Sequence, residues 1–317
     1  MIEILGITSP IFLIVFLGYA LTRRGLFKIA DIRVFGTFVV NLALPALVFK
    51  ALSASRLADI LNPTYLFAFS FGSLLALGIG YASGRFLCDR SPLASTFYAM
   101  GTAGANSGFV GYPILLLTLP SVAGVSLALN MMVENLLIIP LILIMAERGK
   151  NGVGSWTTLR KLMRKLSANP LILSMIAGIV ASSLELKVPP MITRTVDMLA
   201  AASGALSLFV IGGALVGQTI GSVGKSVVPI ILGKLFLHPL GVLAGLFLAA
   251  LIGLPPLDPT LQMAAILMAA MPMMSIYATL ALQYGQEDFA AIAQLLTTLI
   301  SFFTLSGLLW LLRLIFA

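Results

Sequence analysis

An apolar stretch near residues 94–117 carries in its middle the run Gly104-Ala105-Asn106-Ser107-Gly108-Phe109-Val110-Gly111-Tyr112-Pro113. Three glycines and a proline make a poor continuous helix, because glycine costs about 1 kcal/mol and proline about 3 kcal/mol relative to alanine inside a helix. The run therefore predicts a helix that is interrupted partway along. A second interruption is expected at Pro272, in Ala270-Met271-Pro272-Met273-Met274-Ser275.

The chain around these interruptions has the composition of a membrane protein. Of its 317 residues, 60% are hydrophobic and only 9% are charged, whereas an ordinary soluble domain has about 25% charged residues. Apolar stretches of about 17–25 residues, long enough to cross a hydrocarbon core of about 30 Å, recur along the chain. Such segments must be helical, because backbone polar groups find no water in lipid. We predict an all-α membrane protein with ten transmembrane helices, near residues 4–21, 34–53, 64–86, 94–117, 123–145, 170–186, 196–217, 226–252, 261–282 and 289–315.

The net charge of +8 indicates membrane topology rather than a nucleic-acid surface, because the basic residues lie in short loops and at helix ends. Ten spans place both termini on one side of the membrane. The opposite side holds fourteen basic residues: Arg23, Arg24, Lys28, Arg33, Arg85, Arg90, Arg148, Lys150, Arg160, Lys161, Arg164, Lys165, Lys225 and Lys234. The terminal side holds five: Lys50, Arg56, Lys187, Arg194 and Arg313. We expect a multi-pass protein of the cell inner membrane, and the positive-inside rule predicts that both termini lie outside and the 148–169 loop lies in the cytoplasm.

The 148–169 loop separates two halves, 1–147 and 170–317, each with five expected spans. Both halves open on a proline followed eight residues later by a glycine, namely Pro10 with Gly18 and Pro170 with Gly178. Because five is odd, the second half would enter the membrane in the inverted orientation. Inverted repeats with interrupted helices at matching positions are a recurring design of secondary transporters.

The loop itself carries apolar residues at helical spacing among basic ones. This pattern predicts a short interfacial helix on the inner leaflet, although basic residues that only obey the positive-inside rule would look the same. The residues are Trp156, Leu159, Leu162, Met163 and Leu166, with Arg160, Lys161, Arg164 and Lys165 between them.

Three polar residues are candidates for a coupling ion or proton. Glu134, beside Asn135, is expected at mid-depth in the fifth span. A carboxylate there is costly and by default functional, as a proton carrier, an ion ligand or half of an ion pair. The alternative is a structural hydrogen bond made by a protonated acid. Gln294, early in the tenth span, lies where an inverted repeat would place a counterpart.

Lys234 and His238 lie four residues apart, on one face of the eighth span. Lys234 could attract an anionic substrate, pair with Glu134, or extend to the inner interface. His238 precedes a proline, and we interpret it as a packed, hydrogen-bonded side chain rather than a proton relay.

Several of these segments resemble the auxin efflux carrier family, which includes plant PIN-type auxin exporters and bacterial carriers of malonate and related acids. The run Asn106 to Pro113 resembles the fourth-helix motif of that family, and Asn41-Leu42-Ala43-Leu44-Pro45-Ala46-Leu47-Val48-Phe49 resembles its second-helix motif. Later segments are similar to its sixth, eighth and ninth helices: Arg160 to Pro170, Lys234 to Pro239 and Ala270 to Gly285. The bacterial branch fits best, because the long hydrophilic loop of many plant members is missing.

The resemblance implies a fold related to bile-acid and sodium–proton carriers, in which the interrupted helices 4 and 9 cross near the midplane between a scaffold and a transport unit. Pro113 and Pro272 would be the crossing prolines. Asn106 would contact the substrate carboxylate, with Asn41 and Pro45 lining the site. The remaining candidate substrate-binding residues come from the interrupted segments themselves: Ser107, Gly108 and Ser275.

We therefore predict a secondary transporter that moves a small organic anion, such as malonate or an auxin-like acid, by alternating access. Its partners would be the organic acid and the bilayer, with proton or sodium coupling and a homodimer left open, and without nucleic acid. An intramembrane enzyme is the first alternative, but a single histidine and a single cysteine, Cys88, cannot build a typical zinc site, and no cofactor is expected. A membrane receptor or channel is the second alternative, although paired interruptions suit alternating access better.

Overall fold

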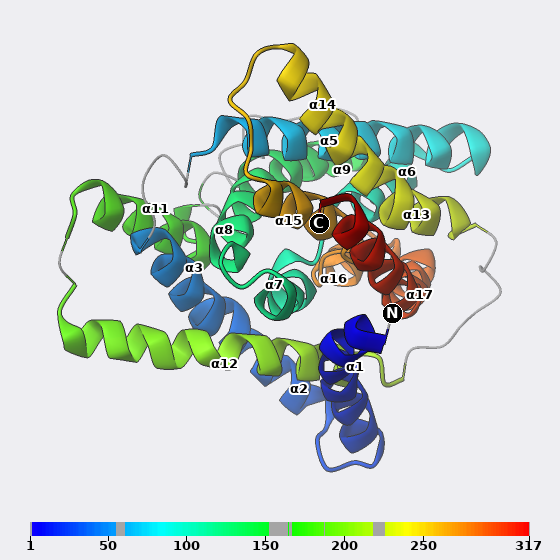
Figure 1. Ribbon diagram of the computed structural model, residues 1–317. Coiled ribbons are helices and arrows are strands. Elements are labelled where there is room, and N and C mark those ends of the chain that lie inside the picture. The colour runs from blue at the N-terminus through cyan, green and yellow to red at the C-terminus, as the bar shows by residue number, and fades with distance from the viewer. Residues whose placement is uncertain are drawn as a thin grey trace. The chain divides into compact units, whose positions relative to one another are not determined.

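The computed structural model describes residues 2–54, 61–151, 164, 167–186, 188–217 and 226–316. All the regular elements of these residues are helices, and helix is present in every stretch that was expected to span the membrane (Figure 1). The predicted all-α class is therefore confirmed. Most of the expected interfacial helix, residues 152–163 and 165–166, lies outside the described residues.

Within the described residues, six helical stretches are long and apolar enough to cross a membrane: Ile29–Ser53, Pro63–Leu87, Ala123–Lys150, Pro190–Ala214, Val228–Leu251 and Phe289–Ile315. Three shorter apolar helices accompany them: Ser9–Arg23, Pro170–Ser183 and Pro259–Ala270. Large apolar side chains such as Phe86 and Phe303 are exposed, as lipid-facing side chains would be. The protein is a multi-pass membrane protein, while ten spans in two inverted repeats stay a prediction.

The chain divides into two compact units that interleave along the sequence. Unit 1 consists of Met1–Asn62, Ser107–Met131 and Ser167–Gly217, and unit 2 consists of Pro63–Asn106, Met132–Leu166 and Gln218–Ala317. Each unit therefore takes segments from both predicted halves, so the halves 1–147 and 170–317 are not themselves compact bodies. Whether they are related as inverted repeats stays a prediction.

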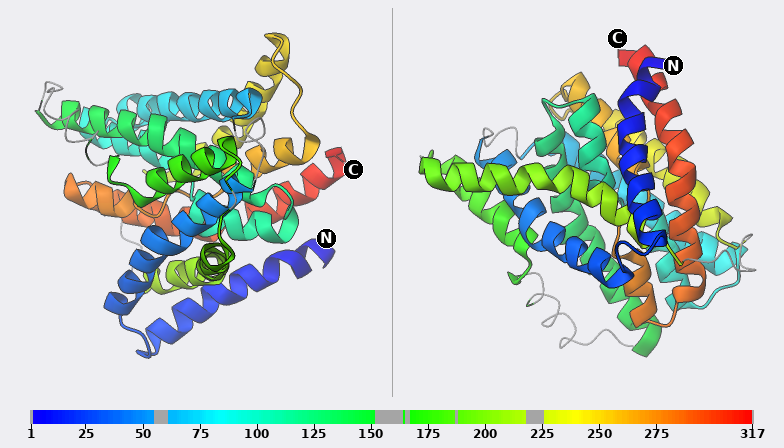
Figure 2. Two further views of the ribbon diagram at one scale, coloured as in Figure 1. Left: turned by 90° about the vertical axis from the view of Figure 1, so that its left-hand side faces the viewer. Right: turned by 90° about the horizontal axis from the view of Figure 1, so that it is seen from below.

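Within the described residues, unit 1 contains nine helical elements or parts of them. They are α1 (Ile2–Arg23), α2 (Ile29–Phe38), the π-helical turn η1 (Val39–Ala43), α3 (Leu44–Ser53), the π-helical turn η3 (Ser107–Gly111), α7 (Tyr112–Thr118), most of α8 (Ala123–Val133), α11 (Pro170–Ser183) and α12 (Pro190–Ala214). Three of these, α2, η1 and α3, form one continuous stretch, Ile29–Ser53. In this unit α12 packs against α1, α2 and α3, and α11 packs along α3 (Figure 1, Figure 2).

Glycines allow α1 and α12 to approach closely. A Cβ atom at Gly212 would collide with the backbone carbonyl oxygen of Val15, and one at Gly18 would collide with the carbonyl oxygen of Phe209. Small residues commonly set such contacts between membrane helices, because lipid supplies no hydrophobic force that would drive the helices together.

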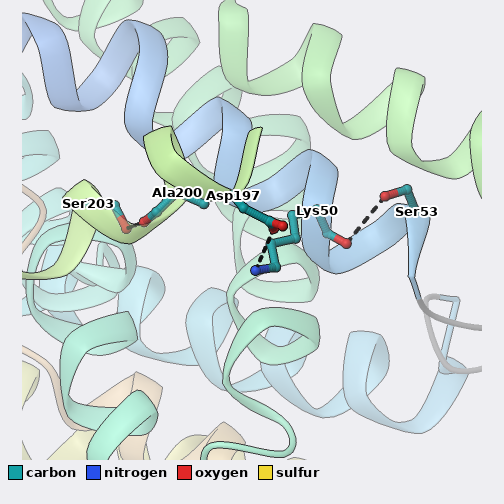
Figure 3. A network of polar contacts seen from close by, with 5 residues as sticks. All are labelled: Lys50, Ser53, Asp197, Ala200 and Ser203. Atoms are coloured by element: carbon teal, nitrogen blue, oxygen red, sulfur yellow. Dashed lines mark hydrogen bonds and ion pairs between the residues drawn. The ribbon is translucent and has the colours of Figure 1, made fainter. Parts of the chain in front are cut away.

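At the other end of α12, Asp197 lies against α3. Its carboxylate accepts from the Lys50 ammonium at 2.7 Å, and both side chains are about half exposed (Figure 3). In an aqueous setting a pair this exposed contributes at most about 1 kcal/mol, so the ion pair aligns two helices that packing already holds together.

Unit 2 contains the remaining helices. They are α5 (Pro63–Ala82), the π-helical turn η2 (Ser83–Leu87), α6 (Pro92–Ala103), the π-helical turn η4 (Glu134–Ile138), α9 (Ile139–Asn151), α13 (Val228–Leu232), the π-helical turn η5 (Gly233–Leu237), α14 (His238–Leu251), α15 (Pro259–Ala270), α16 (Tyr277–Gln283) and α17 (Glu287–Phe316). Helices α5 and α14 cross at glycines, since a Cβ atom at Gly72 would lie 2.5 Å from the backbone nitrogen of Val242 and one at Gly245 would lie 2.6 Å from the carbonyl oxygen of Ala68 (Figure 1).

Among the described residues, five helices begin on a proline: α5, α6, α11, α12 and α15. In three of them the preceding side chain accepts a backbone N–H of the first turn: Ser91 before Pro92, Asn169 before Pro170 and Asp258 before Pro259. The proline has no N–H to leave unpaired, and its φ is preset for a helix. These local signals explain why α6, α11 and α15 begin close to where the sequence predicted.

Proline also explains most of the π-helical turns in the described residues. The turns η1, η3, η4 and η5 each end two residues before a proline, which is Pro45, Pro113, Pro140 and Pro239 respectively. Proline cannot donate to the carbonyl four residues back, and its ring clashes with that carbonyl. In η1, η4 and η5 the residue before the proline donates five residues back instead, as Leu44 does to Val39, Ile139 to Glu134 and His238 to Gly233. The wide turn absorbs the clash without ending the helix.

These four turns carry many of the candidate residues that the sequence singled out. Such single π-helical turns are frequent at functional sites. The residues are Asn41 on η1, Ser107 and Gly108 on η3, Glu134 and Asn135 on η4, and Lys234 on η5.

Candidate functional site

The interruptions of the fourth and ninth predicted spans meet inside unit 2. Helix α6 ends at Ala103, after which Gly104 is extended with φ −75° and ψ 126°. Helix α15 ends at Ala270, after which Met271 is extended with φ −60° and ψ 150°. The backbone N–H of Asn106 donates to the carbonyl of Pro272 at 2.8 Å. This hydrogen bond joins two segments that are more than 160 residues apart in the sequence.

A second contact shows how closely the two interruptions fit. A Cβ atom at Gly104 would lie 2.8 Å from the Cε atom of Met274 and 3.0 Å from the carbonyl oxygen of Met100. Asn106 and Pro272 are both buried. The interruptions are thus a defined, close-packed pairing of extended backbone at the ends of two helices.

Buried hydroxyl groups without partners lie just after the second interruption. In the described residues, the Oγ atom of Ser275 and the Oη atom of Tyr277 have no hydrogen-bond partner, and Tyr277 is 0% exposed. Buried polar groups are nearly always satisfied in proteins, so orphaned ones are typical of places that bind a ligand or water. Ser275 was predicted from the sequence, whereas Tyr277 was not.

Lys234 is held at the same interruption. Its ammonium is 0% exposed and donates to the carbonyl of Ala269 at 2.9 Å and to Nδ1 of His238 at 2.7 Å. Because an ammonium has only donors, Nδ1 must accept, so Nε2 of His238 carries the proton and donates to Ser73 Oγ at 2.9 Å. The interpretation of His238 as a packed, hydrogen-bonded side chain is confirmed.

This placement corrects one expectation about Lys234. It lies within a helical stretch and does not extend to the inner interface, because its bonds to Ala269 and His238 hold the ammonium inside the protein. It therefore does not belong with the loop residues used for topology. The partition of basic residues becomes thirteen against five, and the prediction that both termini lie outside keeps the same basis.

Glu134 lies on η4 in the same unit and is 4% exposed. Its carboxylate attracts the Lys234 ammonium electrostatically. Two opposite charges are thus buried in one unit, and the pairing of Glu134 with Lys234 stays a prediction. Asn135, the next residue, is buried as well.

Gln294, the third residue of the proposed coupling site, is half-buried on α17. Its backbone carbonyl accepts the hydroxyl of Thr298 at 2.7 Å. One turn away, Thr297 is 0% exposed, and in the described structure its hydroxyl has no partner. Thr297 is therefore a better candidate than Gln294 for a side chain that contacts a ligand, because its buried hydroxyl has no partner in the described residues.

The other predicted substrate residues belong to unit 1. Ser107 is buried and its hydroxyl accepts from the Asn130 amide at 3.2 Å. A Cβ atom at Gly108 would lie 2.8 Å from Leu44 Cδ1. Pro113 is buried at the start of α7 and Pro45 at the start of α3. Asn41 is exposed, and its amide donates to the carbonyl of Thr37 at 2.8 Å. Their roles at a substrate, and a helix crossing at Pro113, stay predictions.

A family model described as "Membrane transport protein" matches residues 5–311. The chain belongs to this membrane transport family. This family is the auxin efflux carrier family, whose second- and fourth-helix motifs this chain resembles. The family membership expected from these motifs is therefore confirmed.

One relative is similar to this chain over almost its whole length. It comes from Rhizobium meliloti (strain 1021), bears the name "Putative malonate transporter" and is 29% identical over 317 residues. The alignment covers 99% of this chain and 97% of that relative. Similarity of this extent includes both interruptions and the segment that carries Lys234.

Proposed function

We propose that this member of the membrane transport family is a secondary transporter that moves a small carboxylate by alternating access. The observation that carries the proposal is the hydrogen bond between Asn106 and Pro272, which pairs two interrupted helices inside one unit. Interrupted helices in matching positions of two halves are the feature around which secondary transporters build a midplane site. Ten spans in two inverted repeats would give this arrangement.

Malonate is the substrate that we propose to test first. The similar protein from Rhizobium meliloti bears the name "Putative malonate transporter". In addition, the buried groups at the interruptions suit a small acid. Asn106 has an amide, while Ser275 and Tyr277 have hydroxyls without partners in the described structure. Amide and hydroxyl donors bind carboxylate oxygens without a permanent positive charge that would hold the substrate too tightly.

Substitution of Asn106 tests the proposal directly. In proteoliposomes preloaded with unlabelled malonate, the wild-type protein is expected to take up labelled malonate by exchange. Asn106→Ala is expected to weaken malonate binding at least about tenfold, because a hydrogen bond to a charged group contributes about 1.5–3 kcal/mol. Affinity is measured by titration calorimetry and exchange by filtration.

The matched control is Gln262→Ala. Gln262 also carries an amide, but it lies at the start of α15, where it donates to the Leu257 carbonyl at 2.7 Å. This variant is expected to bind malonate like the wild type. Equal affinity of the wild type and Asn106→Ala would remove Asn106 from the site, and absence of exchange of any organic acid by the wild type would contradict the transport function.

The proposed orientation places both termini outside and the 148–169 loop in the cytoplasm. In a Cys88→Ser background, cysteines introduced by Ile2→Cys and Gly152→Cys are expected to react oppositely with a membrane-impermeant thiol reagent in intact cells. Position 2 should be labelled and position 152 should be protected until the cells are permeabilised. Labelling of position 152 alone would reverse the topology.

A further inference from the structure

The end of α15 at the second interruption has the features of a cation site. The last carbonyls of a helix lack intrahelical donors and carry the negative end of the helix dipole. In transporters with interrupted helices, such helix ends and unwound carbonyls coordinate the coupling Na⁺ or H⁺. Here α15 ends at Ala270, and Met271 continues in extended backbone.

Three carbonyls around this helix end accept hydrogen bonds from protein donors. The Met268 carbonyl accepts the N–H of Met271 at 3.3 Å, and the Pro272 carbonyl accepts the N–H of Asn106 at 2.8 Å. The carbonyl between them, that of Ala269, accepts the Lys234 ammonium at 2.9 Å. A single positive charge therefore sits where a monovalent coupling cation would be expected.

The ammonium is held from its other side as well. Nδ1 of His238 accepts it at 2.7 Å, and Ser73 fixes the opposite nitrogen of the ring at 2.9 Å. The Glu134 carboxylate attracts it. The Ala269 carbonyl oxygen contacts the ammonium and the buried Glu134 carboxylate supplies the opposite charge, and oxygen ligands of this kind also suit a small hard cation.

We propose that the Lys234 ammonium is a covalently attached substitute for a coupling Na⁺ at the interrupted helix, so that this carrier works without sodium. This inference rests on the proposed transport function and deepens it by assigning the coupling cation. Free Na⁺ would have to displace a charge that cannot diffuse away. Removal of the amine should therefore open a monovalent-cation site and make the protein respond to sodium.

The test uses the purified full-length protein in detergent, with NaCl compared to choline chloride at equal concentration and without substrate. The wild type is expected to show the same melting temperature in both salts. Lys234→Ser leaves Glu134 and the Ala269 carbonyl in place and adds a hydroxyl oxygen. We expect Na⁺ to raise its melting temperature by about 2–4 °C, in a saturable manner.

Two controls locate the effect. Lys50→Ser removes a half-exposed lysine that pairs with Asp197 and is expected to show no sodium response. Lys234→Ser combined with Glu134→Gln removes both buried charges and is expected to lose the response that Lys234→Ser alone has gained. A sodium response in the double variant equal to that of Lys234→Ser would overturn the site assignment.

A sodium-specific shift in the wild type, or a folded Lys234→Ser without one, would overturn the proposal. A Lys234→Ser variant that folds only in NaCl would support it. Should this variant fold in neither salt, the wild-type melting temperatures decide alone. Malonate uptake by wild-type proteoliposomes is an independent test. Uptake rates in NaCl and choline chloride that agree within about twofold support the proposal, whereas an acceleration of about tenfold by NaCl contradicts it. If no acid is transported at all, the proposed function fails while the melting temperatures still test the cation site.

Discussion

If Glu134 pairs with Lys234, Glu134→Gln is expected to lower the stability of the protein by about 3–5 kcal/mol, because it leaves the fully buried Lys234 ammonium without a buried partner charge. The double variant that also carries Lys234→Met is expected to recover most of that loss, since a methionine of similar length buries no charge. Melting temperatures in detergent, followed by the loss of monodisperse protein on heating, measure both effects.

Glu287→Gln serves as the control for this pair. Glu287 is exposed at the start of α17 in the same unit, so its neutralisation is expected to change stability by less than about 0.5 kcal/mol. A Glu134→Gln variant that is as stable as the wild type, exchanges malonate and yet no longer accumulates it along a proton gradient would show that Glu134 is a proton carrier instead. A variant that accumulates substrate with wild-type pH dependence would remove Glu134 from the coupling mechanism.

Gly212→Leu is expected to yield no folded protein, because the first atom of any side chain there would collide with the backbone carbonyl oxygen of Val15. Backbone atoms cannot move aside as a flexible side chain can, so α1 would have to leave α12. Overpacking of a close contact commonly costs about 1–3 kcal/mol even for small additions. Gly212→Ala is therefore expected to lower the melting temperature although alanine favours helix.

Gly204→Leu on the same helix provides the matched comparison. No atom lies within 4 Å of a Cβ atom built at Gly204, so this variant is expected to fold with an unchanged or higher melting temperature, since leucine is a better helix former than glycine. Size-exclusion profiles and melting temperatures of the three variants decide the outcome. Equal behaviour of Gly204→Leu and Gly212→Leu would show that the contact between α1 and α12 does not support the fold.

Local features of the sequence were enough to predict the helical class, the approximate helix positions and both interruptions. These follow from the length of apolar stretches and from the cost of glycine and proline inside a helix. The π-helical turns could also have been predicted, because their cause is equally local. A polar residue four to six positions before a mid-helix proline, as at Asn41, Glu134 or Lys234, marks such a turn here.

The meeting of Asn106 with Pro272, the direction of the Lys234 side chain and the interleaving of the two units were decided only by tertiary structure. Hydropathy predicts that a helix lies in lipid, but it does not predict which helices pack against one another, because all apolar helices are equally compatible with lipid. Which helices pack together depends on close backbone approach at positions such as Gly72 and Gly212 and on hydrogen bonds between distant segments. Lys234 could have reached the membrane interface by the snorkelling that its length permits, and it turns inward because the carbonyl of Ala269, on a helix that begins 25 residues later, is placed beside it by that packing.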